Sequence, residues 1–318
     1  MNIDKPILKA ASTISGPIDQ AMIGLLLICG SVLFFIFALM FIFCIRYRKD
    51  SSHNRKLKKQ GSLALEWAWT IATLVIFLGL FVWGVVIYFD MHVAPFGASE
   101  ITVVGKQWMW KFQHPSGRRE INELHIPVGQ PILLTMTSQD VIHSLFIPGF
   151  RIKQDVLPGR YTKTWFEATE IGEYRLFCTQ YCGTMHADMI GQVYVLSDSD
   201  YEKWLEEKVV LSEEPPSESP VSRGESLFKS LGCISCHSEQ SGYLGPSLEG
   251  LFGKKRKLTT GETVLADENY IRESILYPNA KVVEGYQPLM PTFKGKVSED
   301  DLFDLVAYIK SLVLPQKQ

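Results

Sequence analysis

Two long apolar segments near the N-terminus constrain this chain more than any other feature. They run from about residue 21 to 45 and from about 67 to 89, and neither contains a charged residue. Each reaches the roughly 20 residues that cross a bilayer as a helix. A cleavable signal peptide is the alternative for the first segment, but its apolar run is too long and no basic region adjoins it. We therefore predict a transmembrane hairpin within residues 1–91.

The loop between the two apolar segments is strongly basic. It holds one acid, Asp50, against Arg46, Arg48, Lys49, Arg55, Lys56, Lys58 and Lys59. Short loops rich in Lys and Arg stay in the cytoplasm, whereas a solvated basic linker without topological meaning is the alternative. We expect this loop to be cytoplasmic, and both termini and residues 92–318 to lie outside the cytoplasm.

The remaining sequence divides into three parts. Residues 92–210 contain runs such as ITVVG, PILLTMT and GQVYVL, separated by Pro and Gly, which fits a cupredoxin-like β-sandwich. Residues 211–222 are dense in Pro, Ser and Glu and predict a linker. Residues 223–318 show helical apolar spacing and predict a small all-α domain. The formal charge of −2 argues against a nucleic-acid partner.

Four of the six cysteines form two close pairs, and either pair could be a disulfide in an oxidising compartment. The other two, Cys29 and Cys44, lie in the first apolar segment, where a thiol is usually a small apolar side chain.

One pair lies in the sequence CISCH, formed by Cys233, Cys236 and His237. C-x-x-C-H is the signature of covalent haem attachment, in which the two thiols bind the haem and the histidine binds the iron. A disulfide or a zinc site is the alternative. Met290 is the candidate for the second axial ligand, since a thioether suits an electron carrier. Its alternative is a packing role.

The other pair lies in CTQYCGTMHADM, which holds Cys178, Cys182, His186 and Met189. Thiolate and thioether sulfur together with imidazole selects copper. Two cysteines can bridge two coppers, and each copper then needs a histidine. His143 is the candidate for the second one, although a histidine at such a position is more often structural. The remaining histidines and two methionines are interpreted as surface or packing residues: His53, His92, His114, His125, Met136 and Met185.

These motifs, V-x-H-S-x-x-x-P and C-x-x-x-C-G-x-x-H-x-x-M after two apolar segments, resemble subunit II of haem-copper cytochrome c oxidases over about residues 15–210. That subunit holds the dinuclear copper centre CuA. The C-terminal part resembles a class I bacterial cytochrome c, as in bacterial oxidases whose subunit II carries its own cytochrome.

The resemblance implies that Cys178 and Cys182 bridge two copper ions and that His143 and His186 each bind one of them. It also implies that Met189 and the backbone carbonyl of residue 180 are axial ligands. The family usually has glutamate at position 180, where its carboxylate also reaches a magnesium ion at the interface with subunit I. Gln180 keeps the carbonyl but is a poorer magnesium ligand.

Further roles are implied for single residues. Trp108 matches the tryptophan through which electrons reach CuA, with core packing as the alternative. Asp155, close to Arg160, matches an acid that helps dock a donor cytochrome, with a surface turn as the alternative. Glu66 matches the acid at the start of a proton pathway in subunit I. Thr73 replaces a proline that is usual in the family, so we expect a straighter second helix.

The resemblance implies a multi-pass subunit of the bacterial inner membrane that passes electrons from one covalently bound haem c to CuA and on to subunit I. Oxygen reduction and proton pumping then occur in subunit I, and this chain holds no catalytic residue. The donor is a cytochrome c or an upstream quinol-oxidising complex. A CuA-containing subunit of a nitric oxide reductase is the alternative enzyme, and a copper storage protein is an alternative from another class.

Overall fold

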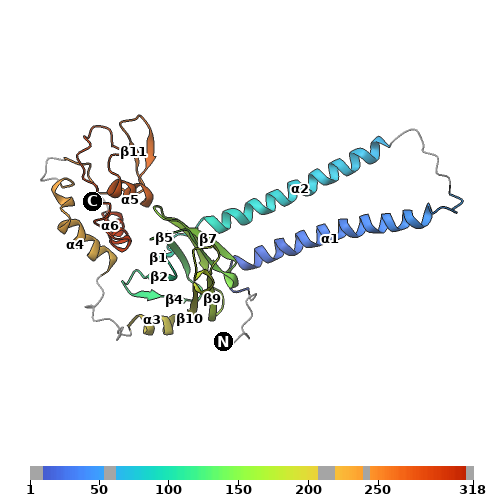
Figure 1. Ribbon diagram of the computed structural model, residues 1–318, viewed down its shortest axis with the longest axis horizontal. Helices are drawn as coiled ribbons and strands as arrows, with labels where there is room; N and C mark the ends of the chain where they lie inside the picture. The colour runs from blue at the N-terminus through green and yellow to red at the C-terminus, as the bar shows by residue number, and fades with distance from the viewer. Residues whose placement is uncertain (1–9, 54–61, 207–218, 239–243, 313–318) are drawn as a thin grey trace.

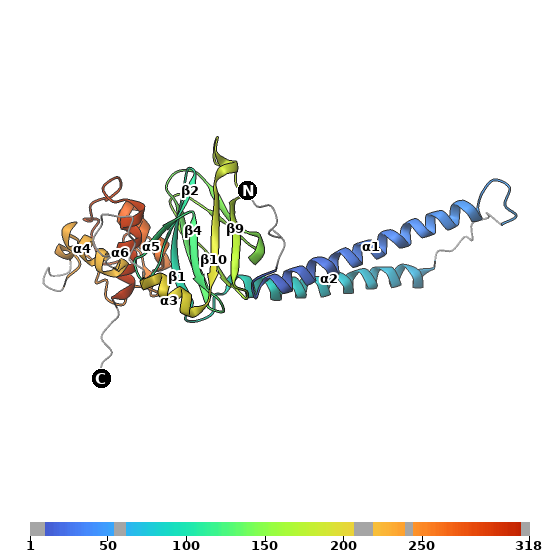
Figure 2. The same cartoon turned by 90° about the horizontal axis from the view of Figure 1, so that it is seen from below.

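The computed structural model describes residues 10–53, 62–206, 219–238 and 244–312. Two long helices project from one side of a β-sandwich, and a smaller helical domain lies on the opposite side (Figures 1 and 2). The basic-loop residues Arg55, Lys56, Lys58 and Lys59 and most of the predicted linker lie outside the described residues.

The two helices are longer than their apolar cores. Helix α1 spans Ser15–Arg46 and helix α2 spans Leu63–His92, and both are long and apolar enough to cross a membrane. Ser62 caps α2 by accepting a hydrogen bond from the Leu65 amide. The helices approach closely at Gly24, because a Cβ atom there would lie 2.9 Å from the Trp83 ring.

The sandwich consists of two five-stranded sheets. The first has the order β3-β2-β1-β5-β8 and the second the order β4-β10-β9-β6-β7. The strands of the first sheet are β1 (Ser99–Lys106), β2 (Met109–Gln113), β3 (Arg119–Ile121), β5 (Pro131–Ser138) and β8 (Thr162–Glu167). Those of the second are β4 (Glu123–Pro127), β6 (His143–Ile147), β7 (Ile152–Val156), β9 (Gly172–Cys178) and β10 (Ile190–Leu196), followed by helix α3 (Asp198–Glu206). Burial alternates along β10, as expected for a strand with one face on the core. The predicted β-sandwich is confirmed.

The segment before α1 belongs to the sandwich. The Ala11 amide donates to the Gly149 carbonyl at 2.9 Å, and the Thr169 amide donates to the Ala11 carbonyl at 2.9 Å. Ala11 is fully buried in the sandwich core. Residues 1–91 are predicted above to form one part with the two helices, whereas Ala11, within that range, packs in the sandwich.

The first helix is also tied to the sandwich by an ion pair. Arg151 donates from Nε and Nη2 to the two carboxylate oxygens of Asp19, at 2.8 and 3.0 Å. Arg151 has φ +56°, a conformation that costs energy for a residue with a Cβ atom. This backbone conformation and the ion pair with Asp19 place the Arg151 guanidinium against the first turns of α1.

The C-terminal domain contains α4 (Pro220–Ser230), the 3-10 turn η3 (Cys233–Ser235), α5 (Glu268–Leu276) and α6 (Glu299–Ser311). Ser298 and Asp301 form a capping box at the start of α6, as the sequence predicts. Helices α4 and α6 cross at Gly224, where a Cβ atom would lie 2.0 Å from the Asp304 carbonyl oxygen. The domain is helical as predicted, and it adds a short hairpin of β11 (Lys255–Lys257) and β12 (Thr263–Leu265).

Replacing Asp19 with Asn should weaken the joint between α1 and the sandwich. We expect the sandwich to lose about 1–2 kcal/mol of stability, because a charge-assisted pair is lost at a partly buried position. Thermal unfolding of the full chain in detergent, together with hydrogen exchange at the Ala11 amide, measures the effect. Lys203→Ala removes an exposed pair with Asp200 and should change neither quantity; equal effects of the two substitutions would contradict the prediction.

Candidate metal centre and haem pocket

Two distant segments meet at one end of β6 and β9, which are neighbouring interior strands of the second sheet. Strand β6 begins with His143 and strand β9 ends with Cys178, and the two strands pair antiparallel with Leu145 opposite Cys178. The loop after β9 then carries Cys182 and His186 before the chain returns in β10. Sheet pairing therefore brings the predicted ligands together from both sequence segments.

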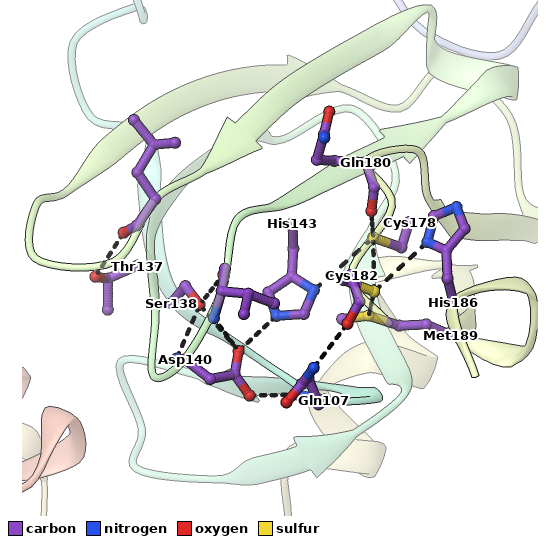
Figure 3. Close-up of polar contacts among 12 residues, drawn as sticks. Gln107, Thr137, Ser138, Asp140, His143, Cys178, Gln180, Cys182, His186 and Met189 are labelled. Atoms are coloured by element: carbon purple, nitrogen blue, oxygen red, sulfur yellow. Dashed lines mark hydrogen bonds and ion pairs between the residues drawn. The ribbon is translucent and has the colours of Figure 1, made fainter. Parts of the chain in front are cut away.

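The sulfur and imidazole atoms of this cluster face one another (Figure 3). The Sγ atoms of Cys178 and Cys182 are 3.9 Å apart, and both cysteines are free. His143 Nδ1 lies 3.9 Å from Cys178 Sγ, and His186 Nδ1 lies 3.5 Å from Cys182 Sγ. A disulfide, whose sulfur atoms are about 2.05 Å apart, is not what this geometry shows.

Two further groups complete the ring of donors around the thiols. Met189 Sδ lies 3.8 Å from Cys182 Sγ, and the Gln180 carbonyl oxygen lies 3.3 Å from Cys178 Sγ. His143 and Met189 are almost fully buried, whereas the Gln180 residue is exposed. Two thiols, two imidazoles, a thioether and a carbonyl form a mainly soft donor set that fits copper.

Two residues of this site were missed by sequence reasoning. His143 Nε2 donates to Asp140 Oδ1 at 2.8 Å, which directs Nδ1 toward the thiols. The other Asp140 oxygen accepts from the Gln107 amide at 2.7 Å, and the Gln107 side chain donates to the Cys182 carbonyl at 2.7 Å. Gln107 and Asp140 therefore connect the histidine segment with the cysteine loop. The sequence feature that could have pointed to Asp140 is its position three residues before His143.

The two thiols differ in their tendency to ionise. Burial raises the pKa of Cys178, but the His143 imidazole and backbone hydrogen bonds outweigh it and lower that pKa to about 6. Burial and the neighbouring Cys178 charge raise the pKa of Cys182 to about 12. Without a cation between them, the second thiol therefore resists ionisation beside the first.

The remaining predicted residues differ in how near they lie to this cluster. Trp108 packs against the cysteine loop, since a Cβ atom at Gly183 would lie 3.1 Å from its ring. Asp155 pairs with Ser144 in the strand register and accepts a 2.7 Å hydrogen bond from its hydroxyl, which lowers the Asp155 pKa. Glu66 lies in the first turn of α2, at the end of the helix away from the sandwich (Figure 1).

Histidines interpreted as packing residues form a separate cluster. The Glu120 carboxylate contacts His114 Nε2 at 2.7 Å and His125 Nδ1 at 2.5 Å. The His125 ring stacks between Tyr194 and Trp204, with centroids 4.5 and 4.6 Å away. Both imidazoles are thus engaged by the same carboxylate. Of the two methionines, Met136 is fully buried and Met185 is exposed.

The C-terminal domain encloses a mainly apolar cavity of about 210 Å³. Cys233, Cys236 and His237 line it together with Met290. His237 Nδ1 donates to the Pro246 carbonyl at 2.8 Å, which leaves Nε2 as the free ligand atom. Both cysteines are free thiols. Two thiols, a directed imidazole and a thioether around an apolar cavity fit a covalently attached haem.

Comparison with known proteins gives two family matches. Residues 118–195 match the family model of the cytochrome c oxidase subunit II periplasmic domain, and residues 221–313 match that of cytochrome c. The first match places the sandwich with domains outside the cytoplasm.

Full-length relatives are similar over most of the chain. Cytochrome c oxidase subunit 2 of Alkalihalophilus pseudofirmus is 29% identical over 304 residues, which cover 92% of this chain and 86% of that protein. The subunit of the same name from Thermostichus vulcanus is 30% identical over 266 residues, which cover 66% of this chain and 80% of that protein. The periplasmic domain of subunit II from Bradyrhizobium japonicum, a crystal structure, is 30% identical over 36% of this chain and 95% of that domain, with a TM-score of 0.35. The chain belongs to the family of cytochrome c oxidase subunit II, and it carries a C-terminal cytochrome c domain.

Proposed function

We propose that this chain is the subunit through which electrons enter a haem-copper terminal oxidase of the bacterial inner membrane. The observation that carries the proposal is the meeting of Cys178 and Cys182 with His143 and His186 around one centre. A soft, buried donor set of this kind supports a metal that exchanges electrons. Oxygen is reduced in partner subunit I, and no residue of this chain is catalytic.

Two copper ions are held by this chain as the dinuclear CuA centre. The thiolates of Cys178 and Cys182, the imidazoles of His143 and His186, the Met189 thioether and the Gln180 carbonyl would hold them. When bound, the copper pair accepts and releases one electron with little change in its ligands. Asp140 holds the His143 ring in place, and Gln107 fastens the cysteine loop. Such a second layer of hydrogen bonds keeps the ligands fixed.

One haem c would be attached covalently through Cys233 and Cys236, and His237 and Met290 would bind its iron. When bound, it supplies a one-electron carrier, and the Met ligand favours its reduced form. The Pro246 carbonyl orients His237, and the apolar lining excludes water. Burial of this kind raises the reduction potential, since the oxidised form carries more positive charge.

Electrons reach the haem from a donor cytochrome c or an upstream quinol-oxidising complex and pass through CuA to subunit I. Trp108, packed against the cysteine loop, is the residue through which they reach CuA. Asp155 contributes to donor docking and Glu66 to the start of a proton pathway. Both helices cross the membrane, and both termini, the sandwich (92–210), the linker (211–222) and the haem domain (223–318) lie outside the cytoplasm.

Replacing Cys182 with Ser should abolish copper binding and leave the haem untouched, because a hydroxyl is a poor bridge between two soft metal ions. Metal analysis and the visible spectrum of the purified full chain measure both centres separately. Cys29→Ser, in α1, is the matched control and should retain both. Loss of haem together with copper in Cys182→Ser would contradict two independent sites.

Replacing Met290 with His should lower the reduction potential of the haem by on the order of 0.1 V or more, because axial ligands set haem potentials over a wide range. A spectroelectrochemical titration of the full chain measures the shift. Leu265→His places the same imidazole at an exposed residue of β12 that does not line the cavity, and it should leave the potential unchanged. Equal shifts in the two variants would argue against Met290 as the axial ligand.

A further inference from the structure

The sandwich and the C-terminal domain share a buried apolar cluster. Val104 of β1 and Tyr161, one residue before β8, are each 3% exposed and belong to the same cluster as the core of the C-terminal domain. The centre of the Tyr161 ring lies 4.8 Å from the centre of the Phe303 ring of α6. The Arg272 guanidinium of α5 lies 5.2 Å from the centre of the same Tyr161 ring. The two domains are therefore packed together and not merely joined by the chain.

Four alternating charges cross this interface. Glu268 of α5, 5% exposed, contacts Lys163 of β8 at 2.7 Å and Lys310 of α6 at 2.9 Å. Lys310 also reaches Glu100 of β1 at 2.8 Å. Burial raises the pKa of Glu268, but the ammonium groups of Lys310 and Lys163 outweigh it and lower that pKa. A buried carboxylate that joins two domains strongly favours the arrangement in which both lysines reach it.

Two further contacts fix the orientation of the domains. The Asn269 side chain of α5 accepts a hydrogen bond from the Tyr161 backbone amide at 2.6 Å and donates one to the Tyr161 backbone carbonyl at 3.4 Å. Both backbone polar groups of Tyr161 are therefore bound by one side chain of the C-terminal domain. Gln113 of β2 donates to Asp304 of α6 at 3.1 Å, and Arg223 of α4 holds the same carboxylate. The sandwich is thus held at both α5 and α6, and two separate contacts restrain rotation about either one.

The covered surface is the outer face of the sheet that contains β2, β1, β5 and β8. Figure 2 shows the C-terminal domain on this side of the sandwich and the two long helices on the other. The haem cavity lies in the domain that is fixed there.

We propose that the cytochrome domain is a permanently docked donor to the copper centre, with Glu268 as the residue that positions it. This inference rests on the proposed function. A tethered domain delivers its electron only when diffusion brings it to the sandwich, so its rate depends on the length of the tether. A docked domain keeps one separation between haem and copper, so its rate does not depend on the linker.

The test lengthens the linker of the full chain loaded with both metals. Inserting about 20 Gly and Ser residues between residues 207 and 218 slows a tethered reaction by about fourfold, since effective concentration falls with linker length. We expect the rate of copper reduction by the haem, measured after a light-triggered electron injection, to change less than twofold. We also expect no change between 20 and 500 mM salt, because Glu268, which both lysines contact, is buried, and buried charges are screened little.

Glu268→Gln and Lys163→Met should convert the docked domain to a tethered one. In either variant we expect the insertion to slow the reaction at least twofold, with unchanged haem potential and copper spectrum. Lys163→Met leaves the sequence of the haem domain unchanged. It therefore tests the same contact if the Glu268→Gln variant does not take up haem. Glu284→Gln removes an exposed pair with Lys257 inside the haem domain and is the matched control.

Hydrogen exchange of the backbone amides of β8 and α5 in the same samples tests the docking itself, independently of any electron-transfer rate. Faster exchange in Lys163→Met and Glu268→Gln, but not in Glu284→Gln, supports docking through Glu268. A fourfold loss of rate on insertion into the wild type, or unchanged exchange in both variants, overturns it. Docking confirmed by exchange with no electron passing from haem to copper would instead overturn the proposed function alone.

Discussion

The pairing of β6 with β9 is the interaction on which the candidate copper site depends. It places His143 beside Cys178 across 35 residues of sequence. Backbone hydrogen bonds between strands fix side-chain positions more firmly than a loop does, so His143 and Cys178, two of the six donors, are held in place before any metal binds. The cysteine loop is bonded to strand β6 only at its start, where the Thr179 amide donates to the Ser144 carbonyl. It depends on Gln107, whose side chain holds the Cys182 carbonyl.

The charges of the site explain why two cysteines so close together require a partner. Cys178 ionises readily because His143 and backbone groups stabilise its thiolate, but its charge then opposes ionisation of Cys182. Cations bound beside both thiolates would remove this repulsion. The same closeness leaves the two thiols prone to oxidation to a disulfide before metal arrives. The site is therefore suited to a metal and poorly suited to being empty.

Local patterns predicted most of the fold and most of the cluster. The apolar segments predicted both long helices, and the Pro and Gly spacing predicted the sandwich. The Cys, His and Met spacing predicted a set of side chains that the structure brings together. Each of these features depends on residues that lie close together in the sequence, so it can be predicted without knowledge of the fold.

Features that join distant segments could not be predicted in this way. Gln107 is an ordinary polar residue in the sequence, and only the fold brings it to Cys182. Glu268 looks like the usual acid in the first turn of a helix, and the sequence gives no sign of Lys163 beside it. The β11–β12 hairpin is too short for periodicity to reveal. The packing of Ala11 into the sandwich depends on Gly149 and Thr169, which lie more than 130 residues later.

That last contact has a consequence for how the chain is laid down in the membrane. Ala11 precedes the first helix and bonds to Gly149 and Thr169, which follow the second helix. Segments that share a core must lie on one side of the bilayer, so the chain between them crosses it an even number of times. In the topology proposed above, the sandwich can close around Ala11 only after both helices have crossed the membrane. Insertion of the two helices then precedes closure of the sandwich, because Ala11 must first lie on the side where Gly149 and Thr169 fold.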